Sequence, residues 1–142
     1  MTYRLIYSSI AEPNITNSDF RLIAMLAAVK NAEHDINGLL LNYNEDILQV
    51  LEGKEAAVKQ LYASIKKDNR HHSVTIRSEG FVRKAEFKKW SMGYRPLNAC
   101  IDQKLFFTLT QNSLNEALPN QPSPDITSAI KEFLLKTDIS YA

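Results

Sequence analysis

The chain has 142 residues, of which 44% are hydrophobic and 23% are charged, and its formal net charge at pH 7 is +1. This length suits one globular domain, and the balanced charge argues against nucleic-acid binding. No stretch approaches the ~20 consecutive apolar residues that a membrane span requires. The single cysteine, Cys100, excludes an internal disulfide and favours a reducing compartment, so we expect a cytoplasmic protein.

The first half of the chain predicts a strand followed by a helix. Aromatic and branched residues predict a buried strand over Tyr3–Ser9, which ends before the turn-forming residues around Pro13. Ser18 is the expected helix cap, and the helix should run to about Asn31. Apolar residues recur in it at helical spacing, namely Leu22, Ile23, Leu26, Ala27 and Val29.

The middle of the chain predicts a hairpin, a second helix and two more strands. Ile36–Tyr43 and Asp46–Leu51 are apolar runs separated by a two-residue turn, which is typical of a hairpin. An amphipathic helix is expected over Ala57–Ile65. Strands are expected over Val74–Val82 and Lys89–Tyr94. The predicted order is therefore βαββαββ.

This order predicts an α+β fold, a ferredoxin-like mixed five-stranded sheet with two helices on one face. Residues 102–118 and 124–137 are expected to form a helical lid over the other face, with Pro124 at the first position of the last helix. We therefore expect a core of residues 1–96 and a C-terminal helical extension, residues 97–142, packed on the sheet.

Three polar residues do not fit a purely apolar core. Gln49 interrupts an apolar strand, and an unsatisfied buried amide costs about 1–3 kcal/mol, so it needs a protein or ligand partner. Tyr7, on the neighbouring strand, can point to the same helix-covered face. Asn31 lies near a helix end, where asparagine is often a capping residue. Each has a plain structural explanation, but together one phenol and two amides suit a flat heterocycle such as a flavin.

Five segments of the sequence resemble the BLUF family of blue-light sensors that use FAD. The segments are YRLIYSS from Tyr3, NGLLL from Asn37, LQVLEG from Leu48, DNRHH from Asp68 and KWSM from Lys89. They follow the order of the family across about residues 1–95. The resemblance implies that the chain binds FAD, with FMN or riboflavin as substitutes, and senses light rather than catalysing a reaction.

The resemblance also implies roles for individual residues. In the family, light drives transfer of an electron and a proton from a tyrosine to the flavin, after which a glutamine rearranges its hydrogen bonds. The photoactive switch is then formed by Tyr7, Gln49, Trp90 and Met92. Further flavin contacts are implied for Ile23, Lys30, Asn31, Arg70 and His71.

Two positions depart from the family pattern. Asn37 stands where threonine is usual and Ile47 replaces a common phenylalanine, and both are expected to alter the pocket walls. Residues from about 97 onward match nothing firmly. Short family members commonly form homo-oligomers and signal to another protein, so we expect a stand-alone sensor with a protein partner, without nucleic-acid or membrane binding.

Two other functions remain open. A flavin-dependent oxidoreductase would oxidise a nicotinamide cofactor in the dark, although the chain has no G-x-G-x-x-G, phosphate loop or His-Glu-x-x-His motif. A regulatory or interaction module on the same fold would purify without colour.

Overall fold

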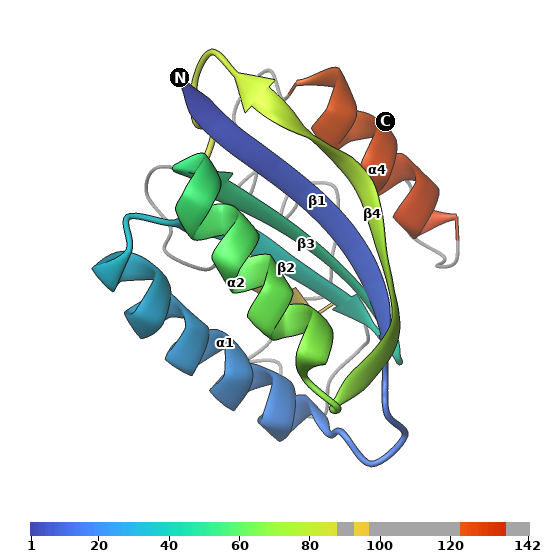
Figure 1. Cartoon of the computed structure of the whole chain (residues 1–142). Helices are drawn as coiled ribbons and strands as arrows, with labels where there is room; N and C mark the ends of the chain where they lie inside the picture. The colour runs from blue at the N-terminus through green and yellow to red at the C-terminus, as the bar shows by residue number, and fades with distance from the viewer. Residues whose placement is uncertain (88–92, 97–122, 136–142) are drawn as a thin grey trace.

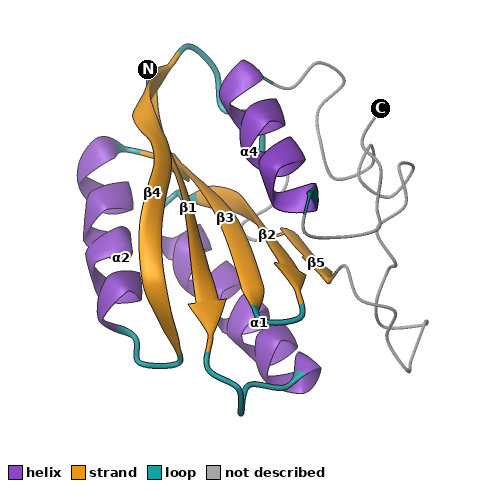
Figure 2. Cartoon of the chain, turned by 90° about the vertical axis from the view of Figure 1, so that its right-hand side faces the viewer, coloured by secondary structure: helices purple, strands orange, loops and turns teal. Residues whose placement is uncertain are grey.

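A mixed sheet separates two helical layers in the computed structural model, which describes residues 1–87, 93–96 and 123–135 (Figure 1). Helices α1 and α2 cover one face and α4 covers the other (Figure 2). None of the helices in these ranges has the length and apolar character needed to cross a membrane. The elements are β1 (Thr2–Ala11), α1 (Asn17–Glu33), β2 (Asn37–Tyr43), β3 (Asp46–Gly53), α2 (Glu55–Lys67), β4 (His71–Val82), β5 (Gly93–Pro96) and α4 (Pro124–Leu134).

The strands lie in the order β4-β1-β3-β2-β5. The strand β5 runs parallel to β2, and the other neighbours are antiparallel. This arrangement confirms the predicted α+β, ferredoxin-like fold. The last strand lies at Gly93–Pro96 rather than at Lys89–Tyr94, and residues 88–92 lie outside the described residues. The predicted helix over 102–118 lies outside them too, and the domain division at residue 96 stays a prediction.

Helix α1 begins earlier than predicted, because Thr16 rather than Ser18 is its N-cap. The Thr16 hydroxyl accepts a hydrogen bond from the backbone N–H of Asp19 at 3.2 Å, and the Asp19 carboxylate accepts one from the backbone N–H of Thr16 at 2.8 Å. This reciprocal capping box needs an acceptor three residues after the cap. Ser18 has Arg21 at that position, and a guanidinium cannot accept.

Two of the predicted elements expose apolar side chains. Leu22, Leu26 and Val29 of α1 are exposed, because α1 turns a different side, with Ile23 and Ala27, toward the interior. On the edge strand β4 Phe81 is also exposed, beside the ring of Tyr3. Periodicity alone therefore identified these elements but not which of their sides is covered.

The two faces of the sheet carry separate hydrophobic cores. Successive residues of a strand point to opposite faces, so Leu5 and Tyr7 of β1 face the α1/α2 layer, while Ile6 faces α4. The helix α4 packs its apolar side against the second face, the one that carries Ile6. The second core comprises Ile6, Leu39, Leu41, Leu48, Val50 and Phe87 from the sheet side, with Ile126, Ala129, Ile130, Phe133 and Leu134 from α4.

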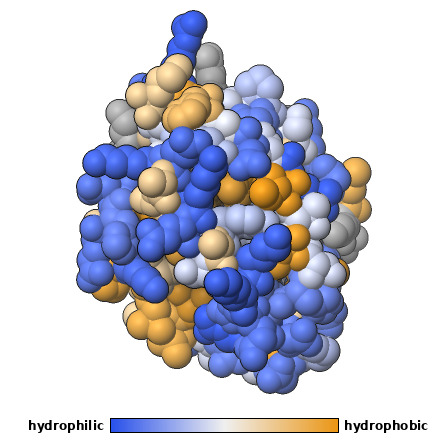
Figure 3. Space-filling model, viewed as in Figure 1, coloured by the Kyte–Doolittle hydropathy of each residue, from blue (hydrophilic) through white to orange (hydrophobic). Residues whose placement is uncertain are grey.

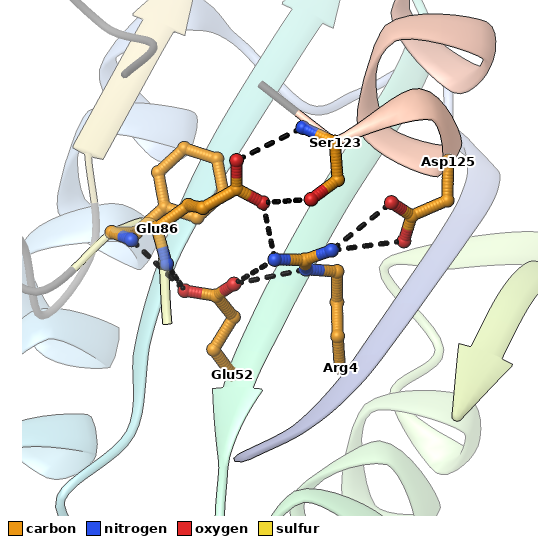
Figure 4. A network of polar contacts seen from close by, with 6 residues as sticks. Arg4, Glu52, Glu86, Ser123 and Asp125 are labelled. Atoms are coloured by element: carbon orange, nitrogen blue, oxygen red, sulfur yellow. Dashed lines mark hydrogen bonds and ion pairs between the residues drawn. The ribbon is translucent and has the colours of Figure 1, made fainter. Parts of the chain in front are cut away.

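A buried ion network fastens α4 to the sheet (Figure 4). Arg4 of β1 lies directly opposite Glu52 of β3, and the two residues are 1% and 0% exposed. The Arg4 guanidinium donates from Nε to Glu52 at 2.9 Å and from Nη1 to Asp125, in the first turn of α4, at 3.0 Å. It also contacts the carboxylate of Glu86. One arginine thus joins β1, β3, the segment after β4 and α4.

The carboxylates of this network have further partners. Glu52 accepts from the backbone N–H groups of Glu86 and Phe87 at 2.8 and 2.9 Å, and Glu86 accepts from the backbone N–H and hydroxyl of Ser123 at 2.9 and 2.7 Å. Burial lowers the pKa of Arg4, but its hydrogen bond and attraction to Glu52 outweigh burial and raise it overall. The guanidinium therefore stays charged, and the hydrogen bonds offset its desolvation.

We expect the Arg4→Met variant to lose about 3–5 kcal/mol of unfolding free energy, because it leaves buried carboxylates without their cation. Urea unfolding followed by circular dichroism measures this loss. Lys59→Met is the matched control, since Lys59 is 54% exposed, pairs with Glu55 on the surface of α2 and lies 5.3 Å from the centroid of the Tyr3 ring, and it should lose less than about 1 kcal/mol. Equal losses in both variants would contradict the role of the network.

Candidate functional site

A cavity of about 300 Å³ lies between α1, α2 and the face of the sheet that these helices cover. Its walls are mostly apolar, with Phe20 and Ile23 from the α1 side, Leu61 and Ile65 from α2, and Ile47 from β3. Every residue with a predicted flavin contact lines it. These are Tyr7, Ile23, Lys30, Asn31, Gln49, Arg70 and His71.

A phenol and an amide form a hydrogen-bonded pair in this cavity. Tyr7 and Gln49 are directly opposite each other on β1 and β3, and they are 3% and 6% exposed. The Tyr7 hydroxyl donates a hydrogen bond to Oε1 of Gln49. Burial, with smaller contributions from Tyr62 and Asp68, raises the pKa of Tyr7 far above its ordinary value, so the phenol keeps its proton at neutral pH. The structure therefore brings together two residues that are 42 positions apart in the sequence.

Neighbouring rings hold the Tyr7 side chain in place. The ring of Tyr62 on α2 lies 5.7 Å from it between centroids, at an interplanar angle of 56°, and the ring of His71 lies 6.4 Å away at 73°. The register between β1 and β4 shifts at Ile6/Tyr7 and again between Ser8 and Ile10. Such irregularities are common beside functional sites, where they re-aim side chains.

The ring nitrogens of His71 are already bonded within the protein. Nδ1 lies 2.8 Å from the hydroxyl of Ser9, and Nε2 lies 2.6 Å from the carbonyl oxygen of Ile65. Because a carbonyl only accepts, Nε2 must carry a proton. In this arrangement His71 forms a wall of the cavity and links β1 to the end of α2, and its implied contact with the flavin stays a prediction.

Asn31 and Lys30 reach the cavity from the last turns of α1. Asn31 is 2% exposed, and its backbone carbonyl accepts from the N–H groups of His34 and Ile36 at 3.1 and 2.9 Å, as the helix ends. The C-cap of α1 is His34, so Asn31 is not the capping residue of this helix, and its role in the site stays a prediction. Lys30 is exposed and lies where the cavity opens to solvent.

The sequence patterns suggested no role for Asp68, whose carboxylate lines the cavity beside Arg70. Asp68 accepts hydrogen bonds from the Nε of Arg70 at 2.9 and 3.0 Å and from its backbone N–H at 3.0 Å. The Arg70 side-chain hydrogen bond lowers the pKa of Asp68, and this bond in turn raises the pKa of Arg70. The Asp-x-Arg spacing in DNRHH was the available signal, since it permits this local pair.

Other sequence-based candidates lie elsewhere. Ile47 lines the cavity as expected, but Asn37 does not, so the expectation that Asn37 alters the cavity wall was wrong. Asn37 instead lies opposite Glu52 at the start of β2. Trp90 and Met92 lie outside the described residues. Within the residues that are described, no three histidine, cysteine or acidic side chains are grouped to hold a metal ion.

Similar proteins include light-responsive ones. Photoactivated adenylate cyclase subunit beta of Euglena gracilis is 39% identical over 71 residues, which are 50% of this chain and 8% of that protein. The structure of BlsA in its photo-activated state is 28% identical with a TM-score of 0.68, covering 95% of this chain and 96% of that one. Klebsiella pneumoniae BlrP1 with FMN and cyclic diGMP is 31% identical with a TM-score of 0.65, covering 68% and 26%.

The chain therefore spans less than a tenth of the cyclase and about a quarter of BlrP1. The family model for sensors of blue light using FAD matches residues 2–93, which include both members of the Tyr7–Gln49 pair and the whole α1/α2 layer. On this match over more than half of its length, the chain belongs to the BLUF family.

Proposed function

We propose that the chain detects blue light through a flavin bound in the cavity and that Tyr7 and Gln49 convert the absorbed light into a change of hydrogen bonding. The observation that carries this proposal is the buried phenol–amide pair in a cavity with mostly apolar walls. A structural core would fill such a space with side chains, because protein interiors are close-packed.

The chemistry of the cavity fits a flavin ring. Its volume is at the lower end of the ~300–1,000 Å³ typical of ligand sites, which suits a flat ring system more than a whole dinucleotide. Apolar walls such as Ile23 and Leu61 suit the ring faces, while Asn31 and Gln49 offer amide donors and acceptors for its polar edge. FAD is the flavin of the family, and FMN or riboflavin would present the same ring. The BlrP1 structure with FMN supports this substitution.

Tyr7 and Gln49 would carry the response to light. A bound flavin supplies absorption of blue light and, when excited, an electron acceptor. Tyr7 gives up an electron together with its phenolic proton, which its hydrogen bond to Gln49 positions for transfer. The carboxamide of Gln49 can accept through its oxygen and donate through its nitrogen, so its rearrangement changes the hydrogen bonds that the cavity offers. In the family pattern Trp90 and Met92 complete this switch.

The cations at the cavity opening would hold the phosphate-bearing part of the cofactor. Lys30 and Arg70 both line this opening, and both are exposed. Arg70 keeps a bidentate pair with Asp68, which fixes its side chain before any ligand binds. Asn31 anchors the ring from the end of α1.

The output would be a protein–protein signal rather than a reaction of this chain. The relatives named as cyclases are far longer than the matched region, which suggests that their catalytic activity resides outside it. We propose that this chain is a cytoplasmic sensor that signals to a protein partner.

Absorption spectra recorded before and after blue illumination test the proposal. The purified chain should be yellow, and its spectrum should shift slightly and reversibly to the red. Tyr7→Phe should retain the flavin and lose this shift, because the phenol is the electron and proton donor. Tyr62→Phe is the matched control, since this neighbouring ring lies outside the cavity lining and should keep the response. An unchanged shift in Tyr7→Phe, or nicotinamide oxidation in the dark, would contradict the proposal.

Gln49→Leu should also bind the flavin without responding to light. Leucine approximately preserves the volume of the side chain and removes every hydrogen bond that the amide makes. The light-minus-dark difference spectrum measures the response, and Gln60→Leu on the exposed side of α2 is the control. A normal photocycle in Gln49→Leu would rule out the amide as the switch.

Asn31→Ala should weaken flavin binding about tenfold, because it removes an amide from a buried position in the cavity. The ratio of flavin to protein absorbance after dialysis reports the occupancy. Asn69→Ala, in the exposed turn before β4, should retain full occupancy. Equal occupancy in both variants would argue against Asn31 as an anchor.

A further inference from the structure

The outer side of α1 carries a stripe of exposed apolar side chains. Leu22, Met25, Leu26 and Val29 are 54%, 61%, 61% and 64% exposed. Their spacing places them along one side of the helix, and we call them the α1 stripe. Figure 3 shows an apolar patch where α1 lies in that view, bordered by hydrophilic residues. Isolated exposed apolar residues are normal on a monomer, whereas a contiguous group marks an interaction surface.

Neither the cavity nor the core accounts for this stripe. Ile23 and Ala27 of α1 line the cavity, but among the stripe residues only Leu26 does so. A ligand in the cavity would therefore leave Leu22, Met25 and Val29 exposed. None of the stripe residues belongs to the hydrophobic clusters found in the described part of the chain.

The charges beside the stripe favour a second copy of the same helix. Asp19 and Lys30 are separated by about three helical turns, so they flank the stripe on the same side. If two α1 helices pack antiparallel, Leu22 of one copy meets Val29 of the other and Met25 meets Leu26. Asp19 of each copy then lies near Lys30 of the other. Opposite charges meet twice in this arrangement.

We propose that the α1 stripe is a homodimer interface in which the α1 helices of two copies pack antiparallel about a two-fold axis. The same surface serves both copies, as in the isologous interfaces of most homodimers. Apolar side chains form its centre, and the Asp19–Lys30 pairs lie at its rim, where they select the antiparallel orientation. The apolar centre of the interface does not depend on flavin binding, whereas its rim shares Lys30 with the proposed phosphate contacts at the cavity opening.

Sedimentation velocity of the full, flavin-loaded chain over a concentration series tests the interface. The unmodified chain should dimerise, and Val29→Glu should raise the dimer dissociation constant roughly thirtyfold or more, because it places a charge in the apolar centre. Leu135→Glu is the control, since Leu135 is 84% exposed after α4, and it should leave the dissociation constant unchanged. Far-ultraviolet circular dichroism and flavin absorbance confirm that each variant is folded.

A chain that stays monomeric, or a Val29→Glu variant that dimerises normally, would overturn the proposal. Disulfide cross-linking tests the orientation in a Cys100→Ser background. Leu22→Cys mixed with Val29→Cys should give a reducible dimer, whereas either variant alone should not. Cross-linking of either variant with itself, or none in the mixture, would refute antiparallel packing.

Discussion

The antiparallel pairing of β1 with β3 is the constraint on which the rest of the structure depends. It places Tyr7 directly opposite Gln49 and Arg4 directly opposite Glu52. Because side chains alternate between the two faces of a sheet, the first pair lines the cavity and the second faces α4. A one-residue slip of either strand would send its side chains to the wrong face. One strand pair therefore builds both the site and the attachment of α4.

The two polar pairs differ in how readily they can rearrange. Breaking the ion network would leave buried charges unpaired, at about 3–5 kcal/mol, so Arg4 and Glu52 suit a permanent attachment. A neutral hydrogen bond such as that between Tyr7 and Gln49 contributes only about 0.5–1.5 kcal/mol to stability. The proposed switch therefore uses the weaker pair, while the stronger pair keeps the sheet and α4 together during the change.

Helix α1 illustrates why apolar periodicity predicted that a helix forms but not which of its residues are buried. Apolar residues occur on both its inner and outer sides, and such a pattern usually indicates a helix buried all round. In the folded chain Ile23 and Ala27 line a cavity, whereas Leu22 and Val29 are exposed. A cavity that holds a ligand and a surface that binds a partner both require apolar residues. Their sequence pattern is therefore the same as that of a core.

The sequence by itself determined the order of the elements, the fold class and the family, because apolar periodicity, turn residues and short motifs are local signals. It also identified several residues that line the cavity, but it missed Asp68 and wrongly included Asn37. Only the tertiary structure decided that both ring nitrogens of His71 are occupied and that Arg4 binds Glu52, Glu86 and Asp125. These partners are far apart along the chain. No local pattern records such a contact, because it exists only once the sheet has paired and α4 has packed against it.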